Sequence, residues 1–212
     1  MTNTSGPAVS LAPISDAGAF VGMAAEMIPT IHEWAISFLT RPHEMLGRAG
    51  AVCPFTKPSL DRQMFWAGVD DAHYTTPDQL VGLMEGMADQ FIELPGEAGK
   101  DAIFKVALVV LPNVTDYALI DRAHASLKDR FVSQGLMIGQ FYPGCTVGGL
   151  WNPEFKPLDA PLPMLVIRHM VVTDFPFLVG SREWMDIFLR KFAPSIPSPV
   201  RAAMVQHLAT AA

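Results

Sequence analysis

Residues that can ligate a metal ion or bind an anion gather in the segment 135–170. An apolar stretch ends there at Tyr142, and an irregular loop rich in Gly and Pro follows over 142–162. A second apolar stretch then carries Arg168 and His169. Loops of that length are uncommon inside compact domains unless they have a function. We therefore expect the functional site of this protein in this segment.

The neighbours Arg168 and His169 should point to opposite faces of a sheet, because side chains alternate along a strand. The His169 imidazole suits a metal ligand or a general base, since its ordinary pKa lies near neutral pH. Its alternative role is a core histidine bonded to a backbone carbonyl. The Arg168 guanidinium can clamp a carboxylate with two hydrogen bonds, or form an internal ion pair with Asp159 or Asp174. We expect one of the two to be functional and the other structural.

Three more side chains have the chemistry of iron ligands. Tyr142 could supply a phenolate, as tyrosine does in some haem proteins, or it is an aromatic residue at a rim. Cys53, in a Val-Cys-Pro-Phe turn, and Cys145, in the Gly-rich loop, could supply thiolates. Buried cysteines are more often inert packing. The two cysteines lie in different turns and in an expected reducing compartment, so we predict that they stay unpaired.

Composition limits the class of protein. The chain has 212 residues, of which 50% are hydrophobic and 17% charged, as is typical of one globular domain. A net charge of −6 without a basic run argues against nucleic acid or an anionic membrane surface as the partner. No secretory signal is visible, and the apolar stretch 103–112 is too short to cross a bilayer. We expect a soluble, cytoplasmic protein that binds a small molecule, with the oligomeric state left open, a homodimer included.

The apolar pattern predicts alternating helices and strands. Strands are expected over 63–69, 103–111, 136–142 and 163–172. Helices are expected over about 15–39 with a break near Pro29, and from Thr76, Thr115, Asp174 and Ser198 onwards. The strand over 103–111 is apolar on both faces, so we place it at the centre of the sheet. The helix after Thr115 carries Asp121 and His124 on its polar face, where we expect both to be solvated.

The predicted fold class is α+β, a mixed α/β arrangement. A flexible segment over 1–14 precedes a single domain over 15–212. Its central sheet has about four strands, with helices mainly on one face and further helices towards both termini.

Two blocks of the sequence resemble an uncharacterised bacterial family that is often encoded in natural-product gene clusters. The first is Arg41-Pro-His-x-x-Leu-Gly-Arg-x-Gly-x-Val-Cys-Pro-Phe55. The second runs from Gly139-Gln-Phe-Tyr-Pro through Asn152-Pro-Glu-Phe to Pro163-Met-Leu-x-Ile-Arg-His-Met170. That family is distantly similar to the YqcI/YcgG family, which includes haem-dependent N-oxygenases acting on amino and guanidino groups. The Cys-Pro-Phe, Asn-Pro and Ile-Arg positions match, whereas the His-Pro pair of that family is Tyr142-Pro143 here.

The resemblance implies a haem-dependent oxygenase, a monooxygenase that N-hydroxylates or otherwise N-oxidises a small amino-acid-like metabolite in natural-product biosynthesis. It implies a b-type haem with His169 as the iron ligand, and with Tyr142 and Cys53 as alternative ligands. Arg168 and Asn152 would complete the cofactor site. Arg168, which would pair with a propionate or a substrate carboxylate, and Tyr142 are the predicted catalytic residues.

A second hypothesis is a cofactor-free small-molecule-binding or accessory protein whose loop 142–162 holds its ligand or a partner. The 12 methionines suit an adaptable surface. The sequence lacks the G-x-G-x-x-G, P-loop, G-x-S-x-G, H-E-x-x-H and C-x-x-C motifs. Their absence argues against a nucleotide-dependent enzyme, a serine hydrolase and a zinc protein.

Overall fold

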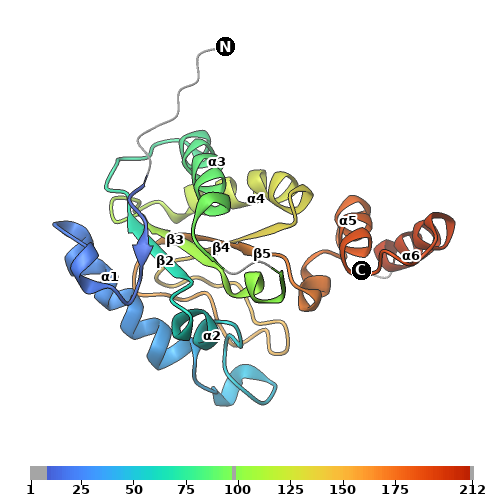
Figure 1. Cartoon of the computed structure of the whole chain (residues 1–212), viewed down its shortest axis with the longest axis horizontal. Coiled ribbons are helices and arrows are strands. Elements are labelled where there is room, and N and C mark those ends of the chain that lie inside the picture. Colours follow the sequence, from blue (N-terminus) through green and yellow to red (C-terminus); the bar gives the residue numbers. More distant parts are fainter. Residues whose placement is uncertain (1–8, 97–98, 211–212) are drawn as a thin grey trace, which may run out of the picture.

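The computed structural model describes residues 9–96 and 99–210. Within them, five strands form one sheet in the order β1-β2-β3-β5-β4 (Figure 1). The strands are β1 Ala12–Pro13, β2 Phe65–Val69, β3 Val106–Val110, β4 Leu136–Phe141 and β5 Met164–His169. β2 and β3 are parallel, and the other neighbouring pairs are antiparallel. The predicted mixed α+β class is confirmed, and β3, the core of the predicted strand 103–111, lies at the centre of the sheet.

The main helices are α1 Met23–Trp34, α2 Thr56–Asp61, α3 Pro77–Glu93, α4 Tyr117–Ser133, α5 Arg182–Phe192 and α6 Ser198–Thr210. Shorter turns are η1 Ala17–Ala19, η2 Ala35–Leu39, η3 Glu44–Leu46, η4 Gly99–Phe104 and η5 Val172–Phe177. The capping box predicted at Thr76 forms at the start of α3. α4 is capped by Asp116 rather than Thr115, because the Asp116 carboxylate accepts from the Ala118 amide.

Two more of the predicted helix boundaries were wrong. α1 runs through Pro29, with Ile28 and Ile31 buried in one cluster on either side of it. This shared burial keeps the helix continuous where the proline removes a backbone donor. Asp174 lies in the η5 turn, and the long amphipathic helix α5 begins only after Ser181, whose side chain accepts from the Trp184 amide.

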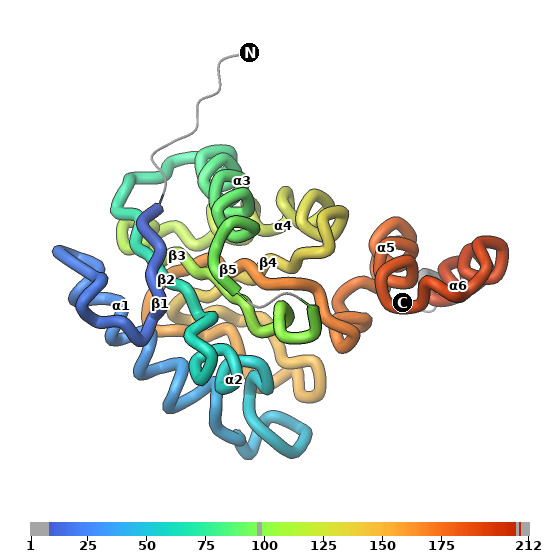
Figure 2. The backbone as a smooth tube through the Cα atoms, in the orientation of Figure 1, coloured from blue at the N-terminus to red at the C-terminus, as the bar shows by residue number. Residues whose placement is uncertain are grey.

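Helices cover both faces of the sheet rather than mainly one. α3 and α4 pack on the face that carries Ala107, Val109 and Ile167, and α1 with η2 packs on the face that carries Leu108 and Val110. The central strands are apolar on both faces, so both faces need a cover. α5 and α6 form an arm beside the sheet (Figure 2).

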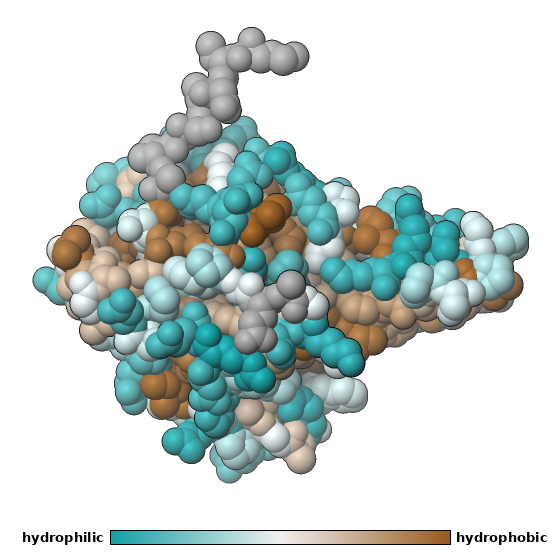
Figure 3. Space-filling view, viewed as in Figure 1, coloured by the Kyte–Doolittle hydropathy of each residue, from teal (hydrophilic) through white to brown (hydrophobic). Residues whose placement is uncertain are grey.

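The arm is attached at the β4 edge of the sheet. Val132 and Met137 contribute to its core. Figure 3 shows apolar surface along the lower side of this arm, near the η5 turn that exposes Val172 and Phe177. Neither Val172 nor Phe177 is a predicted site residue.

The predicted flexible segment 1–14 lies partly outside the described residues, since residues 1–8 are not among them. From Val9 onwards the chain packs against the domain. Val9 and Ile14 are buried, and the Ile14 amide donates to the Phe65 carbonyl over 2.7 Å. Strand β1 thus extends the sheet next to β2, although the segment is rich in turn-forming residues.

Candidate functional site

Two segments far apart in the sequence are joined by Asn152. Its side-chain amide donates to the Met45 carbonyl over 2.8 Å, across 107 positions of the chain, and its Oδ1 accepts from the Glu154 amide. Gly47 adopts φ +78, and a Cβ there would lie 3.0 Å from the Cβ and the carbonyl oxygen of Trp151. Figure 1 shows the loop that contains residue 152, in light orange, beside the light-blue segment around residue 45. We call this contact between 43–47 and 151–155 the clamp.

A cavity of about 290 Å³ lies beside the clamp. Its lining residues are Trp34, Phe38, His43, Met45, Glu154, Phe155, Lys156 and Asp159. We call this cavity the aromatic pocket. Four rings form a continuous wall: the Trp34 and Phe38 centroids are 5.9 Å apart and stacked, those of His43 and Phe155 are 4.7 Å apart, and those of Phe38 and Phe155 are 6.0 Å apart.

The helix that contributes Trp34 and Phe38 changes its winding between them. α1 ends at Trp34 and continues as a π-helical turn, in which the Thr40 amide donates to the Ala35 carbonyl over 3.1 Å. Such wider turns are rare and are frequently found at functional sites. The two rings, four residues apart, both lie towards the loop that carries Phe155.

Charged groups complete the lining of the aromatic pocket. Glu154 and Asp159 contribute carboxylates, and Lys156 contributes one ammonium. The Gly144 amide donates to Asp159 Oδ1 over 2.8 Å, which fixes that side chain. His43 Nδ1 accepts from the Met45 amide over 3.2 Å, so in its neutral form the proton is on Nε2, which is then a donor. Aromatic faces with an excess of carboxylate favour a cationic ligand.

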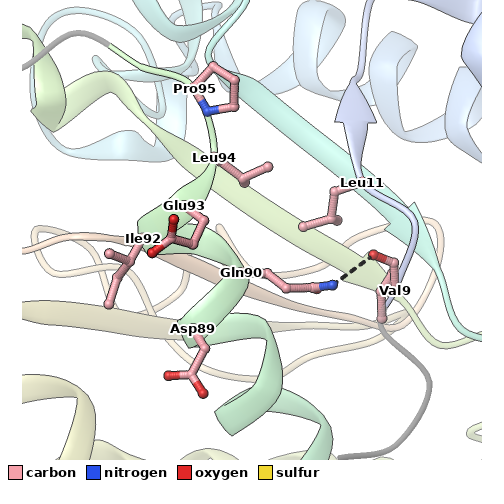
Figure 4. A pocket seen from close by; sticks show the side chains of 8 residues that line it. All are labelled: Val9, Leu11, Asp89, Gln90, Ile92, Glu93, Leu94 and Pro95. Atoms are coloured by element: carbon pink, nitrogen blue, oxygen red, sulfur yellow. Dashed lines mark hydrogen bonds between the residues drawn. The ribbon is translucent and has the colours of Figure 1, made fainter.

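A larger cavity, of about 690 Å³, lies between the end of α3 and the segment around Val9 (Figure 4). Its lining is aliphatic and acidic and comprises Val9, Leu11, Asp89, Gln90, Ile92, Glu93, Leu94 and Pro95. Gln90 Nε2 donates to the Val9 carbonyl over 3.4 Å, and the buried Gln90 Oε1 has no partner in the described chain. This cavity contains none of the predicted site residues. The candidate site is therefore the aromatic pocket.

Tyr142 lies on the α4 side of the sheet and is 8% exposed. Its hydroxyl donates to both carboxylate oxygens of Asp121, over 2.9 and 3.1 Å, and its ring stacks on Tyr117 at 4.8 Å. Burial, together with the neighbouring Cys145 and Asp121, raises the pKa of the Tyr142 phenol well above its ordinary value. The hydroxyl is therefore protonated near neutral pH and joins the end of β4 to α4.

Asp121 and His124 were predicted to be solvated, and this prediction was wrong. Asp121 accepts from Tyr142, and His124 Nε2 lies 3.1 Å from the Ile138 carbonyl oxygen. Burial, then the nearby Lys128, lowers the pKa of His124. Asp121, His124 and Lys128 follow one another at spacings of three and four, so they form one stripe along α4. This stripe faces the edge strand β4 instead of solvent.

Arg168 forms the internal ion pair that was one of its two predicted roles. Its guanidinium donates to the two Asp174 carboxylate oxygens over 2.6 and 2.7 Å. Asp174 is only 2% exposed and also accepts from the Val171 amide over 2.8 Å. The Arg168 guanidinium is thus committed to positioning the η5 turn at the end of β5.

His169 lies on the opposite face of β5 from Arg168, as the alternation predicted, and packs 5.1 Å from the Phe91 ring. Burial lowers its pKa to about 4, with additional effects from Lys105 and Lys191. Both ammonium groups bond to backbone carbonyls: Lys105 donates to Leu94 at the end of α3, and Lys191 to Gly135 just beyond α4. The His169 imidazole is therefore neutral at pH 7.

The structure does not bring the predicted haem ligands together. Tyr142 and His169 share a face of the sheet, but His169 pairs with Leu136 at the far end of β4. Six residues of strand separate the two positions by about 20 Å. Cys53 belongs to the cluster on the other face. Neither cavity described above is lined by any of these three predicted ligands.

The other predicted residues are placed separately. Asn152 lies in the clamp beside the aromatic pocket, while Arg168 is held at the end of β5. Among the described residues, no group of three or more His, Cys, Asp or Glu side chains is arranged to hold a metal ion. Cys53 and Cys145 are both unpaired, as predicted. The residues predicted for one haem site therefore lie in separate places.

Sequence reasoning missed Trp34, Phe38, His43 and Phe155 as residues of one site. His43 and Phe155 stand in the two blocks that carry the family resemblance. That position was the one signal in the sequence that could have pointed to them as site residues. Trp34 and Phe38 have ordinary helical spacing, which indicates a core face just as well.

A family model described as a domain of unknown function, DUF6875, matches residues 28–203. Neither the curated proteins nor the solved structures gave a match. The matched range includes the clamp and the lining of the aromatic pocket. Within the described residues, no helix is both long and apolar enough to cross a membrane.

Proposed function

The chain belongs to the DUF6875 family, and we propose that its aromatic pocket binds a small organic cation, such as an amine or a guanidine. The observation that carries this proposal is the four-ring wall of Trp34, Phe38, His43 and Phe155 beside two carboxylates. The alternative function predicted from the sequence, a cofactor-free small-molecule-binding protein, is therefore the one that the geometry supports best.

The chemistry of the lining selects the charge of the ligand. A cation over the face of an aromatic ring gains about 0.5–1 kcal/mol at an exposed site and about 2 kcal/mol when desolvated. Glu154 and Asp159 add two negative charges against the one positive charge of Lys156. The volume of about 290 Å³ is at the lower limit of ligand pockets, so it suits a small head group.

Haem-dependent N-oxidation stays a prediction that rests on the family resemblance. The predicted ligands Tyr142, His169 and Cys53 lie in three separate environments. Titration with hemin tests the prediction directly, because a haem protein develops a Soret band. Failure of the His169→Ala variant to change such a band would exclude His169 as the iron ligand.

Isothermal titration calorimetry with choline tests the proposed function. 3,3-Dimethylbutan-1-ol is the matched neutral probe, since it has nearly the same shape without the charge. We expect choline to bind with a dissociation constant on the order of 1 mM, and the neutral alcohol to bind at least about tenfold more weakly. Equal affinity for both probes, or no heat with choline, would contradict the proposal.

Variants of the two exposed carboxylates test whether choline binds in the aromatic pocket. Glu154→Gln combined with Asp159→Asn removes two negative charges while keeping side-chain shape and the acceptor for the Gly144 amide. We expect this variant to weaken choline binding about five- to tenfold. The matched control is Glu26→Gln with Asp61→Asn, which removes two charges from α1 and α2 outside the pocket lining.

A further inference from the structure

The two segments that meet at the clamp carry several exposed apolar side chains. Met45, which lines the aromatic pocket, is 41% exposed, and Val147, Leu150 and Trp151 in the loop are 42%, 48% and 62% exposed. Soluble domains expose single apolar residues routinely, but contiguous apolar patches mark binding surfaces.

The backbone of the loop ties these side chains to the pocket. The Gly149 amide donates to the Phe155 carbonyl over 2.8 Å, so this part of the loop is closed by a bond to a residue that lines the pocket. Leu150 and Trp151 form the tip of this closed loop. At the tip, the backbone of Trp151 lies against Gly47, two residues after Met45.

The clamp fixes this tip in place. The Asn152 amide holds the Met45 carbonyl, and the absence of a Cβ at Gly47 leaves room for Trp151. Met45 and Trp151 are therefore held next to each other beside the aromatic pocket, and we call the exposed apolar side chains of Met45, Leu150 and Trp151 the apolar rim.

We propose that the ligand is amphiphilic: its cationic head fills the aromatic pocket and an aliphatic tail lies across Met45, Leu150 and Trp151. This inference rests on the proposed function and names the class of ligand more closely. A pocket of about 290 Å³ holds a head group only, so any longer ligand has to leave it. The apolar rim is the surface that such a ligand meets beside the pocket.

The test is a series of alkyltrimethylammonium probes that differ only in the tail: tetramethylammonium, butyltrimethylammonium and octyltrimethylammonium. Calorimetry measures each dissociation constant below the micelle concentration. Full burial of a methylene gives about a fourfold gain in affinity, and a tail on an open surface is buried on one side, so we expect about twofold per methylene.

The loop variant Leu150→Ser with Trp151→Ser distinguishes the contribution of the tail to binding from that of the head group. Both side chains are exposed, and Trp151 meets Gly47 through its Cβ and its backbone, which serine keeps, so the substitutions leave the core and the clamp intact. We expect the variant to bind tetramethylammonium as the wild type does, while its affinity becomes nearly independent of tail length. The control is Val172→Ser, at an exposed apolar position in η5, which should keep the full dependence.

The outcomes distinguish the two claims. Tetramethylammonium that binds with an affinity equal to that of the octyl probe overturns the amphiphilic ligand and leaves the cation pocket standing. A tail-length dependence that survives in the loop variant also overturns it, because the tail then lies elsewhere. Failure of tetramethylammonium to bind overturns the proposed function, and this inference with it.

Discussion

The side-chain amide of Asn152 holds the carbonyl oxygen of Met45 at 2.8 Å and so joins two segments 107 positions apart. One segment brings His43 to the aromatic pocket and the other brings Phe155, whose rings lie 4.7 Å apart. The hydrogen bond adds a polar link to the ring contact between these two walls. The shape of the pocket therefore depends on Asn152, a residue that is not part of its lining.

Asn152→Ala should loosen the clamp. A lost hydrogen bond of this kind costs about 1 kcal/mol of stability, and we expect choline to bind several-fold more weakly because the rings are less well held. Urea unfolding and calorimetry measure the two effects. The matched control is Asn113→Ala, which removes an Asn bond to the Asp71 carbonyl outside the pocket. An equal loss of choline affinity in the control would show that the clamp has no special role.

Asp174→Asn should destabilise the protein by about 3 kcal/mol, because it leaves the Arg168 guanidinium without its charged partner. Asp174 is 2% exposed and accepts two bonds from Arg168. The comparison is Asp61→Asn, which breaks the exposed pair with Lys57 and should cost less than about 1 kcal/mol. A similar small cost for both variants in urea unfolding would argue that Arg168 is free for a ligand.

Acid should destabilise the protein through His169. Its pKa is lowered to about 4 in the folded state, against about 6.5 in the unfolded chain. Between these values the unfolded chain binds a proton that the folded protein does not. The free energy of unfolding therefore falls as the pH drops from about 6.5 to about 4, by up to about 2 kcal/mol after allowing for partial exposure of the ring.

His169→Gln, which cannot titrate, should flatten that pH dependence when unfolding is measured at several pH values. The lowered pKa of His124 acts in the same direction, so part of the slope should remain. An unchanged slope in the His169→Gln variant would mean that the imidazole is not the source of the acid sensitivity.

Tyr142→Phe should cost about 2 kcal/mol, since the phenol donates to the Asp121 carboxylate and bonds to charged groups are stronger than neutral ones. Tyr117→Phe is the matched control, because it keeps the stacked pair and removes a hydroxyl for which no bond is seen in the described chain. Equal stabilities of the two variants would contradict the assigned role of Tyr142.

The sheet could be predicted because its signals are local. Alternation along 164–169 correctly separated Arg168 from His169, and the two-sided apolar character of 106–110 correctly placed β3 at the centre. The number of covered faces was harder to predict, since α1 and α3 have similar apolar stripes and nothing in either sequence states which face each helix meets.

The site could not be predicted, because its residues are brought together by contacts between distant segments. Trp34 and Phe38 have the spacing of core residues, and only the proximity of Phe155 makes them part of a pocket. The prediction that Asp121 and His124 are solvated was wrong for the same reason. Their helix face is polar, and its partner turned out to be the edge strand β4 rather than water.

The most direct measurement is a titration followed by the ¹H–¹⁵N resonance of the Trp34 indole, assigned with the Trp34→Phe variant. Choline should shift this resonance saturably, and 3,3-dimethylbutan-1-ol should shift it much less at equal concentration. The Trp66 indole, which lies outside the aromatic pocket, should stay unchanged. A Trp34 resonance that choline does not move, or that both probes move equally, would contradict the assignment of the aromatic pocket as a cation site.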